Sequence, residues 1–205
     1  EISKKQKIRN HSKQWLRIFY KHIKGNKKMD AIQMLLNRRS CRSYTKEQIS
    51  DETLKIIIDC GLAAPSAMNE QTVKIVVVQE PEKVKFLSEL NDKIWQKHTD
   101  PFYGAPTVCL ILAPKNTEDV KESHKLNQVK DGSLVIGAMQ DAAYALGVGS
   151  CWINRCKEML ELPEGKKVLE ELGLPNYFGI GCVILGMPDK KLGEKKIKEG
   201  RVIRY

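Results

Sequence analysis

The chain has 205 residues, 41% of them hydrophobic and 29% charged, which is enough for one domain with a buried core. Its formal net charge of +10 suggests a partner such as nucleic acid, but residues 1–28 contain ten Lys and Arg against one Glu and so carry +9 of it. The other 177 residues hold 25 basic and 24 acidic side chains, which argues against a fold that binds a polyanion through its own surface.

The basic N-terminal segment comes first in chain order. Its apolar residues fall roughly on one helical face: Ile8, Trp15, Leu16, Phe19 and Ile23. Three interpretations stay open: a helix that lies on a membrane surface, a transit-like segment, or a vector-derived or mis-set start that precedes a natural first residue, Met29. We therefore expect two parts, a basic extension at 1–28 and a folded domain at 29–205.

The folded part alternates helical and strand patterns. Helices are predicted from residue 31 onward and then over 50–62, 81–97, 133–146, 157–162 and 163–172. Strands are predicted where apolar, often β-branched residues run together: 73–78, 107–113, 148–153 and 178–186. The polar residues 114–130 predict a mobile loop or a short helix near the site, and the lysine-rich residues 189–205 show no core pattern until Val202 and Ile203.

The helix predicted over 133–146 is the most distinctive element. Asp131 and Ser133 are capping candidates at its start, and Gly147 closes it. Apolar residues cover almost its whole circumference, which predicts burial on all sides. A chain of this size has difficulty surrounding one helix, and the small residues along it would admit another backbone, so we expect a second subunit there. The alternative is an ordinary core helix followed by a core strand.

Several chemistries have no sequence signature here. The chain has no dinucleotide-binding glycine motif after a strand, no phosphate-binding P-loop, no serine-hydrolase elbow and no histidine pair with zinc-ligand spacing. Cys151 could be a nucleophile, but its apolar neighbours favour a buried thiol. The six cysteines form no C-x-x-C pair and, with no signal peptide or membrane span in evidence, predict a reducing, cytoplasmic setting without structural disulfides. The chemistry must come from a bound cofactor, or there is none.

Two segments have the composition of binding sites. Arg38, Arg39, Ser40 and Arg42 follow a helix and offer guanidinium and hydroxyl donors suited to an anion such as phosphate. The alternative is a solvated basic turn. Residues 64–71 are mostly small, and Asn69 and Gln71 offer donor and acceptor groups that suit the edge of a heterocycle. The alternative there is an ordinary loop between a helix and a strand.

Four motifs together resemble the FMN-dependent nitroreductase family over residues 29–205. They are RRSCRSY at 38–44, APSAMNEQ at 64–71, ALGVGSCWI at 145–153 and GCVILGMP at 181–188. The resemblance implies an α+β fold with a central, mostly antiparallel sheet flanked by helices. It also implies an intertwined homodimer with two FMN sites at the subunit interface, which would explain a helix that is apolar all round.

The resemblance also assigns cofactor contacts. Arg38, Arg39, Ser40 and Arg42 would hold the FMN phosphate and ribityl chain. The second subunit would lay six residues along the isoalloxazine: Pro65, Ser66, Ala67, Met68, Asn69 and Gln71. The backbone of Trp152, Ile153 and Asn154 would pass the other flavin face, with an amide near N5. Lys196 or Lys198 would reach the phosphate, where the family commonly has Arg. Thr72-Val73 replaces a frequent Pro-Trp, and Met187 a frequent Tyr, which bears on substrate preference.

The activity implied is hydride transfer from NADH or NADPH to flavin N5, followed by reduction of a nitroaromatic, quinone or related small acceptor in a ping-pong cycle. No catalytic side chain, metal, nucleic acid or membrane is expected. Three alternatives stay open. One is a flavin-binding sensor or store without significant turnover, and another is a sister flavin chemistry such as dehydrogenation or dehalogenation. The third is a protein that binds nucleic acid or membrane through its basic tail.

Overall fold

The computed structural model describes residues 31–116 and 120–205, so the predictions for 1–28 lie outside the described residues. The chain divides into two compact units, residues 1–36 and 37–205. Of the first unit, the described part is most of helix α2 (Ala31–Asn37), which confirms the helix expected after residue 31. All other helices and strands that the structure describes belong to the second unit.

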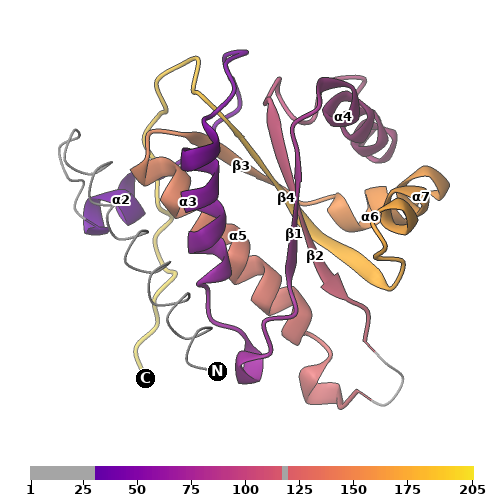
Figure 1. Ribbon diagram of the computed structural model, residues 1–205. Coiled ribbons are helices and arrows are strands. Elements are labelled where there is room, and N and C mark those ends of the chain that lie inside the picture. The colour runs from indigo at the N-terminus through magenta and orange to yellow at the C-terminus, as the bar shows by residue number, and fades with distance from the viewer. Residues whose placement is uncertain (1–30, 117–119) are drawn as a thin grey trace, which may run out of the picture. The chain divides into compact units, whose positions relative to one another are not determined.

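A four-stranded antiparallel sheet forms the centre of the second unit (Figure 1). Its order is β1-β2-β4-β3, with β1 at Lys74–Val78, β2 at Thr107–Pro114, β4 at Tyr177–Gly186 and β3 at Gly149–Ile153. The four strands confirm the predicted ones to within one residue at each end. Strand β2 is buried from Thr107 to Ala113 because it lies inside the sheet and helices cover both of its faces.

Helices cover the two faces of the sheet as separate layers. On one face lie α3 (Asp51–Leu62) and α5 (Asn127–Ala145), and on the other lie α4 (Pro81–Trp95), α6 (Cys156–Glu161) and α7 (Pro163–Glu171) (Figure 1). The Ser50 hydroxyl accepts a hydrogen bond from the Thr53 amide at 3.2 Å and so caps α3 as the sequence predicts. Proline opens α4 and α7, where its missing N–H costs nothing.

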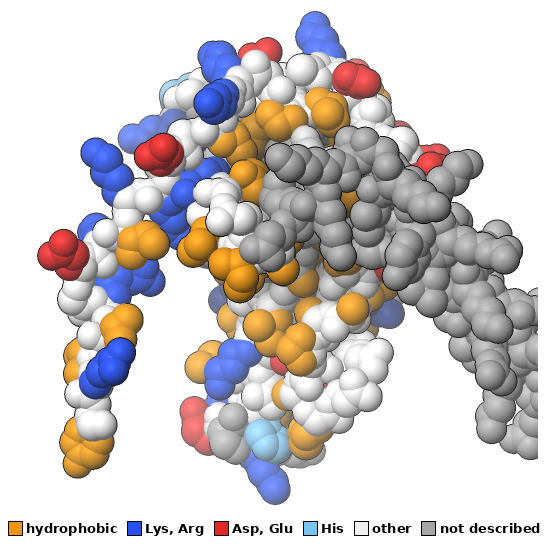
Figure 2. All heavy atoms as spheres, turned by 90° about the vertical axis from the view of Figure 1, so that its left-hand side faces the viewer, with side chains coloured by type: hydrophobic (Ala, Val, Ile, Leu, Met, Phe, Trp, Pro, Cys, Tyr) orange, Lys and Arg blue, Asp and Glu red, His pale blue; other side chains and the backbone are white. Residues whose placement is uncertain are grey.

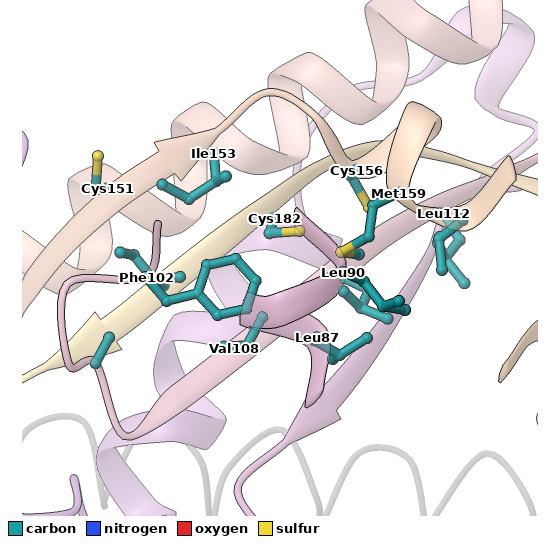
Figure 3. Packing of buried hydrophobic residues seen from close by; sticks show 14 of the residues in the cluster. Leu87, Leu90, Phe102, Val108, Leu112, Cys151, Ile153, Cys156, Met159 and Cys182 are labelled. Carbon is teal, nitrogen blue, oxygen red and sulfur yellow. The ribbon is translucent and has the colours of Figure 1, made fainter. Parts of the chain in front are cut away.

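Alternation along β2 splits the core into two clusters. Val108, Leu110 and Leu112 face α4, α6 and α7, whereas Cys109, Ile111 and Ala113 face α3 and α5. Figure 3 shows the first cluster, in which Leu87 and Leu90 of α4 and Met159 of α6 pack over the sheet. All six cysteines are free thiols, and five of them are buried.

Helix α5 differs from its prediction at its start. It begins at Asn127, six residues before the expected start at Ser133, so Asp131 and Ser133 lie inside the helix and do not cap it. The Ser133 hydroxyl instead donates to the Val129 carbonyl at 2.7 Å. Residues 127–130, part of the stretch that suggested a loop, form the half-buried to exposed first turn of this helix. The predicted end is correct, since the helix stops at Ala145 and Gly147 adopts a φ of 76°.

A single chain does not bury this helix on all sides, as expected for a chain of this size. Val135, Ile136, Met139 and Ala143 are buried against the sheet and α3, but Leu134 is 48% exposed. Figure 2 faces this side of the molecule and shows hydrophobic side chains gathered there. The apolar circumference therefore has one buried face and one open face.

The C-terminal residues 189–205 have no helix or strand, and Val202 and Ile203 are exposed. Among the described residues, no helix is both long enough and apolar enough to cross a membrane.

Candidate functional site

The arginine-containing segment, residues 38–45, is fixed between two strands. Ser40 forms a parallel bridge with Ser150 of β3, and the Cys41 amide donates to the Ser150 carbonyl at 2.8 Å. Further along, the Thr45 amide donates to the Met187 carbonyl at 2.9 Å, just after the end of β4. The segment is therefore an additional edge of the sheet and a rigid platform for its side chains, and not the solvated turn that was the alternative.

Polar groups of this platform lack acceptors within the described part of the chain. Arg38 Nη1 and the Ser150 hydroxyl are both buried without a hydrogen-bond partner there. Arg38 Nε lies 3.5 Å from the Asp141 carboxylate of α5, so the guanidinium has only part of its donor set matched. Buried donors in native proteins have partners almost without exception. A guanidinium N–H and a hydroxyl near one strand end suit the oxygens of an anion such as phosphate.

Burial raises the pKa of Asp141, and the nearby Arg38 guanidinium opposes that shift. The carboxylate holds the guanidinium from the side of α5 and leaves Nη1 free to meet a ligand. The sequence analysis did not select Asp141. A lone acid in an otherwise apolar helix was the signal that could have found it.

The loop at 65–71 has an unusual backbone. Met68, Asn69 and Gln71 have φ values of 51°, 56° and 50°, a left-handed conformation that non-glycine residues rarely adopt. The Ser66 hydroxyl accepts from the Gln71 amide at 3.1 Å, and Gln71 Nε2 donates to Asn69 Oδ1 at 2.8 Å, so the loop is closed on itself. The Met68 side chain is 68% exposed. Strain of this kind occurs where a binding surface requires it.

The two segments contact α5 at different places. The Ala67 amide donates to Asp131 Oδ1 at 3.0 Å, whereas Arg38 pairs with Asp141. Ten helical residues separate the two acids, which is about 15 Å along the axis at 1.5 Å per residue. The structure therefore does not bring the arginine-containing segment and the 65–71 loop together within one chain.

The end of strand β3 carries a partly exposed tryptophan side chain. Trp152 is 40% exposed, Ile153 is buried in the core and Asn154 is exposed. The indole covers Gly181 so closely that a Cβ there would lie 2.2 Å from Trp152 Nε1. This glycine, inside the predicted GCVILGMP motif, therefore allows the indole to lie flat against β4.

Lys196 and Lys198 lie in the exposed C-terminal segment. The segment starts at a fixed point, because the Ser43 hydroxyl donates to Asp189 Oδ2 at 3.0 Å and the Asp189 amide donates to the Ser43 carbonyl at 3.1 Å. Within the described residues neither lysine has an ion pair or hydrogen bond. The two lysines thus stay predicted phosphate contacts. Across residues 31–116 and 120–205, no group of three His, Cys, Asp or Glu side chains is placed so that it could hold a metal ion.

The antiparallel sheet with an additional basic edge, where buried donors lack an acceptor, defines an α+β protein with a candidate site for an anionic ligand. The sequence pattern of the Nitroreductase family matches residues 35–187, and the chain belongs to this family. It is 29% identical over 177 residues to a Bacillus subtilis protein named FMN reductase [NAD(P)H], covering 81% of this chain and 69% of that one.

Two solved structures share the fold. A nitroreductase with bound FMN from Bacteroides fragilis superposes with a TM-score of 0.76 at 28% identity and covers 86% of this chain and 99% of its own. An FMN-dependent nitroreductase from Clostridium difficile gives a TM-score of 0.71 at 26% identity, covering 87% of this chain and 100% of its own. The α+β fold and the family named from the four sequence motifs are thereby confirmed.

Proposed function

We propose that this chain binds FMN and is an NAD(P)H-dependent oxidoreductase. The observation that carries the proposal is the pair of buried donors, Arg38 Nη1 and the Ser150 hydroxyl, beside the start of β3. A phosphate group would supply their acceptors with charge-assisted hydrogen bonds. The relatives whose names include FMN support the same cofactor.

The proposed cofactor site needs two copies of the chain. One subunit would supply Arg38, Arg39, Ser40 and Arg42 for the phosphate and ribityl chain. The second would supply the strained 65–71 loop, because that loop lies about 15 Å along α5 from the arginines of its own chain. The open face of α5, marked by the exposed Leu134, supports burial of this helix in a homodimer.

The residues of this chain would bind and orient the cofactor. Bound FMN would supply the redox chemistry, accepting hydride from NADH or NADPH and passing it to a nitroaromatic, quinone or related small acceptor. Arg38 and Arg42 would neutralise the phosphate, and the backbone at Trp152–Asn154 would line one flavin face with an amide near N5. Lys196 or Lys198 would add a second cation at the phosphate. The candidate residues include no evident acid, base or nucleophile, which fits a site where the protein binds the cofactor and the cofactor supplies the redox chemistry.

The free cysteines support a reducing setting. Burial raises the pKa of Cys109 to about 12, so its thiol stays protonated and unreactive inside the sheet. Five buried thiols without a disulfide are typical of a protein from a reducing compartment. We therefore propose a cytoplasmic location.

A spectrum of the purified protein tests the function. We expect the absorbance bands of oxidised flavin and their loss when NADH or NADPH is added without oxygen. Bands that persist with both nucleotides would identify a flavin-binding protein without this turnover. A colourless protein that takes up no added FMN would contradict the proposal.

A further inference from the structure

Asp131 is a buried acid whose role the cofactor contacts leave unexplained. Its side chain lies in the second turn of α5, and the residue is only 6% exposed. Burying a carboxylate is costly unless its oxygens are hydrogen-bonded. The partner here is the backbone amide of Ala67, 64 residues away in the sequence, at 3.0 Å from Oδ1. Asp131 therefore links the central helix to the loop between α3 and β1.

The position of Asp131 is set by the core. The next residue, Gly132, lies so close to β4 that a Cβ there would be 2.7 Å from Ile180 Cγ1. Val135 and Ile136 then bury the following turn against the sheet. Helix α5 consequently cannot shift at this point, and the carboxylate is a fixed acceptor near the positive end of the helix dipole.

The loop needs such a fixed point. Three of its residues, Met68, Asn69 and Gln71, have left-handed backbones, and a conformation of this kind persists only where the surroundings determine it. The hydrogen bonds that Gln71 donates to Ser66 and Asn69 lie within the loop and close it. The bond to Asp131 anchors it to the rigid part of the molecule, just before the first strained residue.

We infer that Asp131 is a positioning residue that holds the 65–71 loop in its strained shape, and thereby fixes the loop's contribution to the flavin site of the second subunit. The inference rests on the proposed function. Asp131 itself touches no flavin in this arrangement; it acts through the Ala67 amide. A charged acceptor suits this role because its hydrogen bond to a backbone N–H is stronger than a neutral one.

Three variants test the inference. Asp131→Ala removes the acceptor, Asp131→Asn keeps an oxygen that can accept from the Ala67 amide, and Ser133→Ala is the matched control. The control removes a hydrogen bond inside α5, to Val129, and leaves the loop alone. For each we would measure the FMN dissociation constant by quenching of flavin fluorescence, and amide hydrogen exchange over residues 66–71 without FMN.

For Asp131→Ala we expect FMN to bind about tenfold more weakly or worse, on the scale of a lost charge-assisted bond, with faster exchange in the loop. Asp131→Asn should recover most of the affinity, and Ser133→Ala should match the parent in both measurements. Equal affinity and equal loop exchange in Asp131→Ala would overturn the inference. If that variant does not fold, Asp131→Asn decides the question: faster loop exchange than in the parent together with the parent's FMN affinity would overturn the inference.

The two proposals fail in different ways. If the parent protein binds no FMN, the proposed function is wrong, and loop exchange alone then decides whether Asp131 anchors residues 66–71. If the parent binds FMN and Asp131→Ala binds it equally well, the function stands and the positioning role is wrong.

Discussion

The two candidate halves of the flavin site are built in opposite ways. The half at 38–45 is held between two strands by backbone hydrogen bonds, has ordinary backbone angles and contains a buried donor, Arg38 Nη1, that lacks an acceptor in the described chain. The half at 65–71 has three left-handed residues, an exposed Met68 and a single side-chain anchor described above, Asp131. One half is fixed in the sheet with a buried donor unmatched, and the other is strained and held by the hydrogen bonds of Ala67 and Gln71.

This difference assigns different tasks to the two halves. A rigid basic edge suits a phosphate, for which charge and fixed N–H directions matter most. A strained loop at the surface suits a flat ring, for which the shape of the backbone matters most. The first half should therefore dominate cofactor affinity, and the second should tune it.

The largest effect is expected from Arg38→Ala. Loss of the half-buried guanidinium should cost about 2–3 kcal/mol of FMN binding, or roughly 30- to 150-fold in the dissociation constant. Lys85→Ala is the control, because Lys85 is exposed on α4 and pairs with Glu89 on its own helix at 3.9 Å. Fluorescence titration of apoprotein with FMN gives both constants. Equal constants for the two variants would place the phosphate elsewhere.

Mixing two variants tests whether the halves come from different chains. Arg38→Ala and Asp131→Ala each damage one half, so a heterodimer of the two would contain one doubly damaged and one intact site. After subunits are exchanged by mild denaturation, about one quarter of all sites should bind FMN with parent affinity, from statistical pairing of a symmetric dimer. Self-mixed variants are the controls. If no high-affinity sites appear, both halves belong to one chain or the subunits do not pair.

Gly181→Ala should disturb the end of strand β3 through Trp152. The added Cβ meets the indole at 2.2 Å and Ile136 Cδ1 at 2.9 Å, so the indole must move. Overpacking of this kind costs about 1–3 kcal/mol of unfolding free energy. Urea denaturation monitored by tryptophan fluorescence measures it. Gly193→Ala is the matched control, since an added Cβ at Gly193 has no atom within 4 Å. Equal stability of both variants would show that the close contact is not a real constraint.

The sheet could be predicted from the sequence because its strands are continuous apolar runs. Residues 107–113 and 178–186 are apolar at successive positions, so a strand made of them must be buried on both faces. The predicted ranges agree with β2 and β4 to within one residue at each end. The start of α5 could not be predicted in the same way. None of residues 127–130 is buried in the core, and periodicity gives no signal where a helical turn buries no apolar side chain.

The candidate site could be predicted from the sequence only where its residues are close together along the chain. Arginines and small residues at 38–42 and 64–71 indicate ligand binding by their chemistry, which is local to the chain. Asp131 contacts Ala67, 64 residues earlier in the sequence, and Asp141 contacts Arg38, 103 residues earlier. A local sequence pattern contains no information on contacts of such long range. Asp131 preceded an apolar run, so it was interpreted as a helix cap when it is an inward-facing anchor.

Asp141→Asn gives a smaller, pH-dependent effect on the rigid half. The pKa of Asp141 is raised in the folded state, so its contribution to stability is full below about pH 4 and is lost as the pH rises through the folded-state pKa. The variant should therefore gain stability relative to the parent between about pH 4 and 7, measured by thermal unfolding.

Glu164→Gln is a control of opposite sign for that experiment. A hydrogen bond from Lys93 lowers the pKa of Glu164, so the contribution of this acid is present above its ordinary pKa and is lost as the pH falls. A parent and an Asp141→Asn protein whose stabilities change in parallel with pH would show that burial of this acid carries no cost.

Cys151→Ala is expected to have the smallest effect on function. The Cys151 thiol is 2% exposed beside the rigid half, and burial raises its pKa, with Arg42 acting in the opposite sense. A protonated, buried thiol is a packing group and not a nucleophile. The variant should lose about 1 kcal/mol of stability, because a small side chain leaves a small cavity. Its NADH-dependent acceptor reduction should equal that of the parent at a temperature where both are folded. A loss of turnover with flavin still bound would mean that the rigid half takes part in the chemistry, beyond holding the phosphate.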